Sequence, residues 1–161
     1  MDRHPATYVL LGIGTLLTVG HLIMTVSVLQ DHELSVEAAR IFDEIRSTRP
    51  DGYIGNSWRA LAHDPSLLRR TWETYREVMA PGELDPLTKE LIYIAVSVAN
   101  GCNYCIQSHT TAARNKGLTL KGFMELVAVV GMASESNRMT TALQTPLEDR
   151  YKSAFADPNP T

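Results

Sequence analysis

The chain has only two cysteines among its 161 residues, and it has no excess of basic charge. Two cysteines are too few for the disulfide framework of a small secreted domain, so their close spacing points to redox or metal chemistry. The formal net charge is −3 and there is no run of Lys or Arg, which excludes a basic surface for nucleic acid. Sustained alternation of apolar and polar residues is also missing, so the pattern disfavours β-strands.

The composition and length of the chain are those of a folded protein. Hydrophobic residues make up 44% of the chain and charged residues 20%, as in globular rather than disordered proteins. A length of 161 residues suffices for one ordinary domain, with little left for a second.

Helix start and stop signals follow one another along most of the chain. Asp64 is a suitable N-cap, Pro65 suits the first helical position, and Pro81-Gly82 stops the helix. The same Asp-Pro start recurs at residues 85–86, and Ser35 and Thr119 are further caps. Helices are predicted over about 36–47, 65–80, 86–99 and 102–116, with one or two more from 120 onward. The predicted fold class is all-α.

The longest apolar run, residues 8–29, contains no Asp, Glu, Lys or Arg and one histidine. As a helix, its ~22 residues rise about 33 Å, which matches a hydrocarbon core of about 30 Å. We therefore expect a single transmembrane anchor. Two alternatives are a buried or oligomer-interface helix and a cleavable signal, although "VSVLQDHE" is a poor cleavage site.

The anchor defines the expected domain organisation: residues 1–30 as anchor and polar tail, 31–156 as a helical domain, and 157–161 as a flexible tail. Arg40, Arg46 and Arg49 follow the apolar run, whereas only Arg3 precedes it. Under the positive-inside rule, this asymmetry favours a single-pass membrane protein with its soluble domain on the cytoplasmic side.

Both cysteines lie in "NGCNYCIQSH", residues 100–109. At a helix start, cysteines three apart have Cα atoms about 5–6 Å apart, within disulfide range. The unpaired N–H groups and the dipole at the helix terminus favour a thiolate at Cys102. His109 follows Cys105 by four residues and shares its helix face, which favours Cys105 instead. From these residues alone, the choice between the two cysteines stays open.

Glu90 completes the pattern if the chain folds into an antiparallel helix pair at Asn100-Gly101. Glu90 then lies roughly 15 Å before the turn and His109 roughly 13 Å after it, so the two come level. The carboxylate would orient the imidazole, and the imidazole would take the thiol proton of Cys105. Three alternatives are a zinc site built from all four side chains, two cysteines that are simply buried, and a solvated Glu90.

Glu90, eleven intervening residues and "CNYCIQSH" together resemble the E-x11-C-x2-C-x3-H motif of the carboxymuconolactone decarboxylase superfamily, in its AhpD-type alkylhydroperoxidase branch. The resemblance extends from near Ser35 to about Tyr151. It implies an AhpD-like helical bundle that works as a homo-oligomer, commonly a trimer or a larger ring.

The resemblance also implies roles for the four residues. Cys105 would be the thiolate that attacks a hydroperoxide and becomes sulfenic acid, and Cys102 would resolve it as a disulfide. His109 and Glu90 would relay the proton. An external dithiol, such as a lipoyl group, would restore the thiols, so no cofactor or metal is expected.

Two departures from the family pattern bear on function. Tyr104 stands where some members carry a second histidine, which removes a relay through that position, and the apolar run lies outside the family domain. We expect a membrane-anchored thiol peroxidase or disulfide oxidoreductase. The alternative is a weakly active or non-catalytic accessory subunit of a larger membrane complex. A lactone decarboxylase fits less well, because that chemistry needs no cysteine pair.

Overall fold

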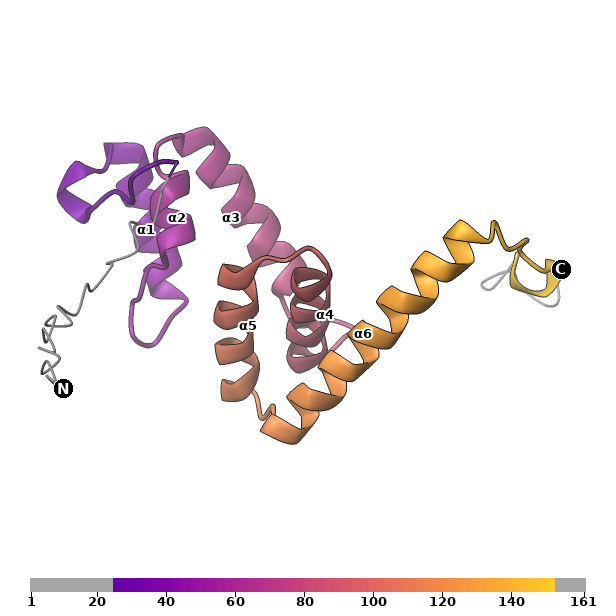
Figure 1. Cartoon of the computed structure of the whole chain (residues 1–161). Helices are drawn as coiled ribbons and strands as arrows, with labels where there is room; N and C mark the ends of the chain where they lie inside the picture. Colours follow the sequence, from indigo (N-terminus) through magenta and orange to yellow (C-terminus); the bar gives the residue numbers. More distant parts are fainter. Residues whose placement is uncertain (1–24, 153–161) are drawn as a thin grey trace, which may run out of the picture. The chain divides into compact units, whose positions relative to one another are not determined.

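The computed structural model describes residues 25–152, and none of these residues is in a strand (Figure 1). Within them lie six α-helices and two short 3-10 helices, η1 (Asp31–Glu33) and η2 (Asp149–Tyr151). The α-helices are α1 (Val36–Ser47), α2 (Asn56–Leu61), α3 (Pro65–Met79), α4 (Pro86–Ala99), α5 (Asn103–Asn115) and α6 (Leu120–Ala142). The all-α prediction is confirmed for this part of the chain, and residues 120–142 form one helix.

The caps agree with the predicted starts. The side chains of Ser35, Asp85 and Thr119 each accept a hydrogen bond from a backbone N–H of the first helical turn. Each satisfies a donor that would otherwise have no intrahelical partner. The short helix α2 was not predicted, because residues 49–56 have the Pro, Gly and Asn content of a loop and its N-cap, Gly55, makes no side-chain hydrogen bond.

The predicted membrane helix falls mainly on residues 8–24, which lie outside the described residues. Its last part, residues 25–29, is described and is not helical. Arg59 holds the end of this segment: its carbonyl accepts from the Leu29 N–H at 3.4 Å, and its guanidinium donates to the Leu29 carbonyl at 2.9 Å. The expectation that the helix continues to Leu29 is therefore wrong, because Arg59 binds the backbone N–H and carbonyl of Leu29. Between residues 25 and 152, no helix has the length and apolarity to cross a membrane.

The described residues divide into two compact units, one up to Trp72 and one from Glu73 onward, each described here by itself. In the first unit, Leu68 of α3 is fully buried, and four more fully buried side chains lie at helical spacing on α1: Ala38, Ile41, Phe42 and Ile45. Trp58 of α2 meets Trp72 edge to face, with ring centres 5.7 Å apart. Trp72 is therefore a core residue, as the sequence indicated.

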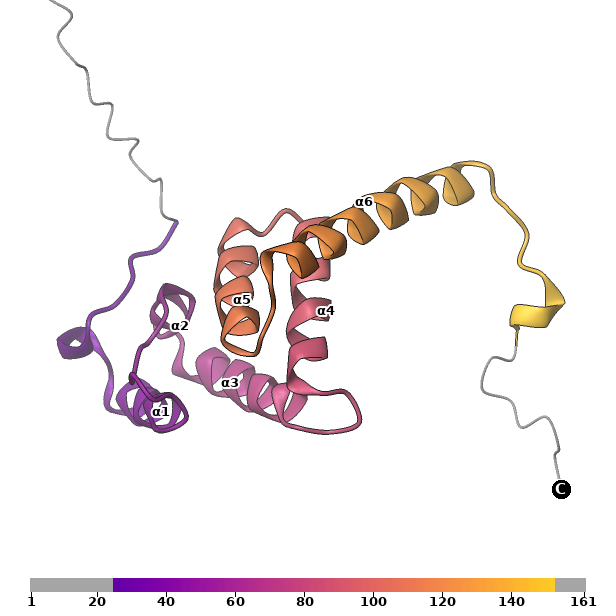
Figure 2. The same ribbon diagram turned by 90° about the horizontal axis from the view of Figure 1, so that it is seen from below.

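The second unit is built on an antiparallel pair of helices, α4 and α5, with α6 also packed against α4 (Figures 1 and 2). Three residues of α4 are buried at helical spacing: Glu90, Ile94 and Ser97. Spacings of four and three place these residues on one face. A glutamate thus occupies a position that would normally hold an apolar side chain.

The turn between α4 and α5 sets the geometry of this pair. Gly101 has a φ of +70°, which glycine adopts without steric cost. The Gly101 N–H donates to the Val98 carbonyl at 3.2 Å, and the Cys102 N–H donates to the Ser97 carbonyl at 2.9 Å. These two bonds form a Schellman motif, which ends α4 and reverses the chain within three residues.

Replacing Gly101 with alanine should lower the free energy of unfolding by about 1 kcal/mol, because a Cβ is disfavoured at positive φ. The added Cβ itself meets nothing within 4 Å, so the cost is conformational. The matched control is Gly131→Ala in α6, where the space is equally open. That change should stabilise the helix by up to about 1 kcal/mol. Urea unfolding followed by circular dichroism measures both; equal effects of the two changes would contradict the role assigned to the turn.

Candidate active site

Cys102 and Cys105 are joined by a disulfide at the start of α5, with their Cα atoms 5.4 Å apart. The separation agrees with that expected for cysteines three apart at a helix start. Cys102 is the N-cap of α5, and its sulfur accepts from the backbone N–H of Cys105 at 3.3 Å. The helix terminus therefore faces the Cys102 sulfur, as the sequence indicated.

Glu90 and His109 meet across the α4–α5 pair. The Nδ1 of His109 lies 2.6 Å from the Oε2 of Glu90, so the predicted contact between them is present. The Glu90 side chain is only 3% exposed, and that of His109 only 12%. A carboxylate can only accept, so Nδ1 carries the hydrogen and Nε2 is left with a lone pair when the imidazole is uncharged. Cys105 lies one helical turn before His109 on α5.

Lys116 is a third member of this group that the sequence reasoning missed. It is the C-cap of α5, and its Nζ donates to the Oε1 of Glu90 at 3.0 Å. Glu90, His109 and Lys116 are called the relay cluster below. The spacing could have indicated this lysine, because Lys116 follows His109 by seven residues, two turns further on the same helix face.

The relay cluster keeps Glu90 ionised. Burial disfavours the charged carboxylate and acts to raise its pKa. Hydrogen bonds from His109 and Lys116, together with the positive charge of Lys116, outweigh burial and hold the pKa of Glu90 below its ordinary value of 4.5. At neutral pH the cluster therefore contains a buried anion.

Two tyrosines flank the imidazole, and neither was predicted as part of the site. The ring of Tyr93 stacks on His109 with centroids 3.5 Å apart and planes 17° from parallel. The ring of Tyr75, from α3, is tilted at 49° with its centroid 6.4 Å away. Tyr93 lies three residues after Glu90 on α4, so the same helix supplies both the hydrogen-bonded and the stacked partner of His109.

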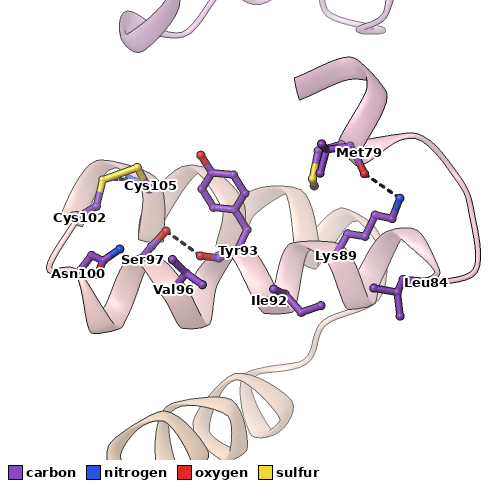
Figure 3. Close-up of a pocket in the computed structure, with 11 residues that line it drawn as sticks. Met79, Leu84, Lys89, Ile92, Tyr93, Val96, Ser97, Asn100, Cys102 and Cys105 are labelled. Atoms are coloured by element: carbon purple, nitrogen blue, oxygen red, sulfur yellow. Dashed lines mark hydrogen bonds between the residues drawn. A yellow bond between two sulfur atoms is a disulfide. The ribbon is translucent and has the colours of Figure 1, made fainter. Parts of the chain in front are cut away.

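A pocket of about 600 Å³ opens beside the disulfide (Figure 3). Cys102 and Cys105 lie at one end of it, Leu84 and Lys89 at the other, and Tyr93 between them. Most of its remaining lining is apolar: Val78, Met79, Ile92 and Val96. This volume and lining are typical of sites that hold a small organic molecule.

The described residues contain no group of three or more His, Cys, Asp or Glu side chains arranged to hold a metal ion. The zinc alternative needed Cys102, Cys105, His109 and Glu90 to converge. In the structure the two sulfurs bond to each other, and His109 and Glu90 bond to each other.

The second unit is all-helical, with a disulfide at a helix start and a buried Glu-His pair. Residues 65–147, just over half of the chain, match the carboxymuconolactone decarboxylase family. The solved AhpD core, an alkylhydroperoxidase of Rhodospirillum rubrum, matches with a TM-score of 0.76 and 48% identity. That match covers 80% of this chain and 97% of the other. The chain belongs to the carboxymuconolactone decarboxylase family, with an AhpD-like fold.

Three curated relatives share shorter segments with the chain. It is 42% identical over 52 residues to uncharacterized protein 4 in the cox locus of Paracoccus denitrificans, 32% of this chain and 47% of that protein. It is 36% identical over 70 residues to alkyl hydroperoxide reductase AhpD of Rhodococcus erythropolis, 40% of this chain and 38% of that protein. For an alkyl hydroperoxide reductase of Mycobacterium tuberculosis, identity is 28% over 99 residues, 62% of this chain and 28% of that protein. The chain thus spans less than half the length of these relatives.

Glu90→Gln should make stability less dependent on pH in the acid range. Because the pKa of Glu90 is lower in the native state than when unfolded, the ionised carboxylate stabilises the fold above about pH 4.5. That contribution is lost as the pH falls through the native pKa. At pH 7 the variant should unfold about 1–3 kcal/mol more easily, since His109 and Lys116 lose their anionic partner.

Urea unfolding of both proteins at pH 7, 5 and 3 measures this difference, which should shrink toward pH 3. Glu125→Gln, at an exposed position of α6, is the matched control and should differ little from the parent at every pH. A Glu90→Gln difference that stays constant across the range would contradict the assigned charge state.

Proposed function

We propose that this protein is a thiol-dependent peroxidase that reduces organic hydroperoxides through Cys102 and Cys105. The observation that carries the proposal is the combination of a disulfide-bonded cysteine pair at a helix start with a buried Glu90–His109 pair across α4 and α5. The alkyl hydroperoxide reductases among the relatives, and the alkylhydroperoxidase core that shares the fold, support the same chemistry.

The peroxide step begins from the reduced pair. The Cys105 thiol gives its proton to the Nε2 of His109, and the Glu90 carboxylate stabilises the imidazolium that forms. The thiolate attacks one peroxide oxygen, the O–O bond breaks, and the leaving alkoxide takes the proton from His109 to become an alcohol. Cys105 is now a sulfenic acid.

The second step closes the disulfide. The Cys102 sulfur attacks the sulfenic sulfur, an S–S bond forms, and water leaves. Cys102 suits this resolving role because its sulfur already faces the helix terminus and accepts from the Cys105 N–H. An external dithiol, of which a lipoyl group is the expected type, then transfers two hydrogens by thiol–disulfide exchange and becomes a disulfide itself.

The pocket offers a place for the organic part of the peroxide. The cysteine pair forms one end of its wall, so a peroxide group can reach Cys105 while an alkyl chain lies against Ile92 and Val96. These two side chains are about half exposed in the chain by itself, at 49% and 54%. Their burial by an alkyl chain would favour organic hydroperoxides over hydrogen peroxide.

The proposal includes attachment to a membrane through the apolar run, with the helical domain on the cytoplasmic side, and assembly into a homo-oligomer. The support for the anchor is the apolar run of the sequence. The support for oligomerisation is α6, which has no buried residue and carries exposed Met124, Val129 and Met132. Such a face is typical of surfaces covered by a second copy.

A second candidate function is a weakly active or non-catalytic accessory subunit of a membrane complex. The apolar run of the sequence supports it, because a membrane segment would attach the helical domain to such a complex whatever the cysteine pair does. The two functions differ in what they require of the cysteine pair, which the next experiment tests.

One equivalent of tert-butyl hydroperoxide should oxidise the reduced full-length protein. The peptide holding Cys102 and Cys105 should lose two hydrogens, about 2 Da by mass spectrometry, as the disulfide closes. Cys105→Ser should keep its remaining thiol. Cys102→Ser should stop at a sulfenic acid, which dimedone traps. If the native pair stays reduced under these conditions, the peroxidase proposal fails and the accessory-subunit function is favoured.

Full-length protein expressed in cells should stay in the membrane pellet after extraction with alkaline carbonate. The double variant Leu16→Arg, Leu17→Arg should move to the supernatant, since each arginine near the centre of a membrane helix costs about 2.5–3.5 kcal/mol. Parent protein found in the supernatant would refute the anchor without bearing on the peroxidase chemistry.

A further inference from the structure

We propose that Lys116 is a positioning residue of the relay cluster: it holds one oxygen of Glu90 and balances its charge, so that His109 works as an uncharged base. This inference rests on the proposed function, because it concerns the same Cys105 thiol. Lys116 lies eleven residues after Cys105 and acts only through Glu90 and His109.

The geometry divides the two oxygens of Glu90 between two partners. Oε2 accepts from the Nδ1 of His109 at 2.6 Å, and Oε1 accepts from the Nζ of Lys116 at 3.0 Å. Lys116 is the C-cap of α5, at the opposite end of this helix from Cys105. With both oxygens engaged, the carboxylate cannot rotate without breaking a charge-assisted hydrogen bond.

Charge balance gives Lys116 its second effect. An ionised carboxylate that is 3% exposed needs a positive partner. His109 carries a positive charge only when protonated, so an uncharged imidazole donates a hydrogen bond to Glu90 without balancing its charge. The ammonium of Lys116, with its side chain 36% exposed, supplies the balancing charge while remaining solvated. His109 is then free to accept the proton of Cys105.

Other titratable side chains meet the relay cluster from three helices. Tyr93 of α4 stacks on the imidazole, the ring of Tyr75 of α3 approaches it, and Cys105 lies one turn away on α5. None of these carries a positive charge, so none can replace the ammonium of Lys116.

The neighbouring charges are directed elsewhere. Lys89 is adjacent to Glu90 in sequence, but its ammonium donates to the carbonyls of Val78 and Ala80. Within residues 25–152, no side chain of α6 forms a hydrogen bond or ion pair with the cluster. Among these residues, Lys116 is the one permanently cationic side chain bonded to Glu90.

The test is the pH dependence of Cys105 alkylation in reduced full-length protein carrying Cys102→Ser, which leaves Cys105 as the only thiol. Iodoacetamide rates are measured from pH 5 to 9 with Lys116 intact and with Lys116→Met. Loss of the ammonium leaves the cluster one charge more negative, which opposes thiolate formation. The alkylation midpoint should therefore move to higher pH, and the rate at pH 7 should fall about three- to tenfold.

Three further variants separate positioning from general effects. Lys116→Arg keeps the charge and should restore at least half of the parent rate. Arg114→Met removes a charge from the same end of α5 and should stay within twofold of the parent. With Glu90→Gln as background, Lys116→Met should have less than a twofold effect, because there is no carboxylate left to balance. The double variant removes the carboxylate of Glu90 and the ammonium of Lys116 together, so it can be measured even if Lys116→Met alone does not fold.

A Lys116→Met profile that coincides with that of Arg114→Met would overturn the inference, as would an undiminished Lys116→Met effect in the Glu90→Gln background. Alkylation needs no peroxide, so the two proposals fail separately. A shifted profile in a protein that peroxide does not oxidise would retain Lys116 and discard the peroxidase. An unshifted profile in an active peroxidase would do the reverse.

Discussion

The second unit depends on one buried anion, the carboxylate of Glu90. A charge at 3% exposure is costly unless every oxygen has a partner, and here one helix supplies both partners. His109 and Lys116 lie two turns apart on α5 and approach the carboxylate on α4 through different oxygens. These bonds allow only one register between the helices, because a shift by a single turn would leave the carboxylate unpaired. The interaction that specifies the packing is thus also the one that occupies the Nδ1 of His109 and leaves its Nε2 free of Glu90.

The tight turn at Gly101 connects this packing to the redox pair. The Schellman motif places Cys102 directly at the start of α5, where its sulfur caps the new helix. Cys105 follows one turn later and His109 one turn after that. The spacings therefore have a physical meaning: the helix from the turn to His109 is about as long as the helix from Glu90 to the turn, so His109 returns to the level of Glu90. The spacing of the four motif residues, Glu90, Cys102, Cys105 and His109, therefore follows from the geometry of one helical hairpin.

The family and the AhpD-like fold limit the reactions to be considered, but the proposed function rests on the residues of the site. The disulfide lies beside an apolar pocket. Under the proposed function, this pocket would hold the organic group of a hydroperoxide. Tyr93 joins the pocket to the relay cluster, since it lines the pocket and stacks on His109.

The amino-acid sequence by itself determined helices α1, α3, α4 and α5, the capping residues and the contact between Glu90 and His109, because local hydrogen bonds and helical periodicity decide them; it did not show the short helix α2. The partners of long side chains on neighbouring helices could be identified only from the tertiary structure. Whether Lys116 meets Glu90 depends on how closely α4 and α5 approach and on which rotamer the lysine adopts. Residues 25–29 looked like the end of an apolar helix, yet Arg59, thirty positions after Leu29, binds their backbone instead. Local sequence signals determine where helices begin and end. The partners of long side chains, and of backbone groups far apart in the sequence, are decided only when the chain packs.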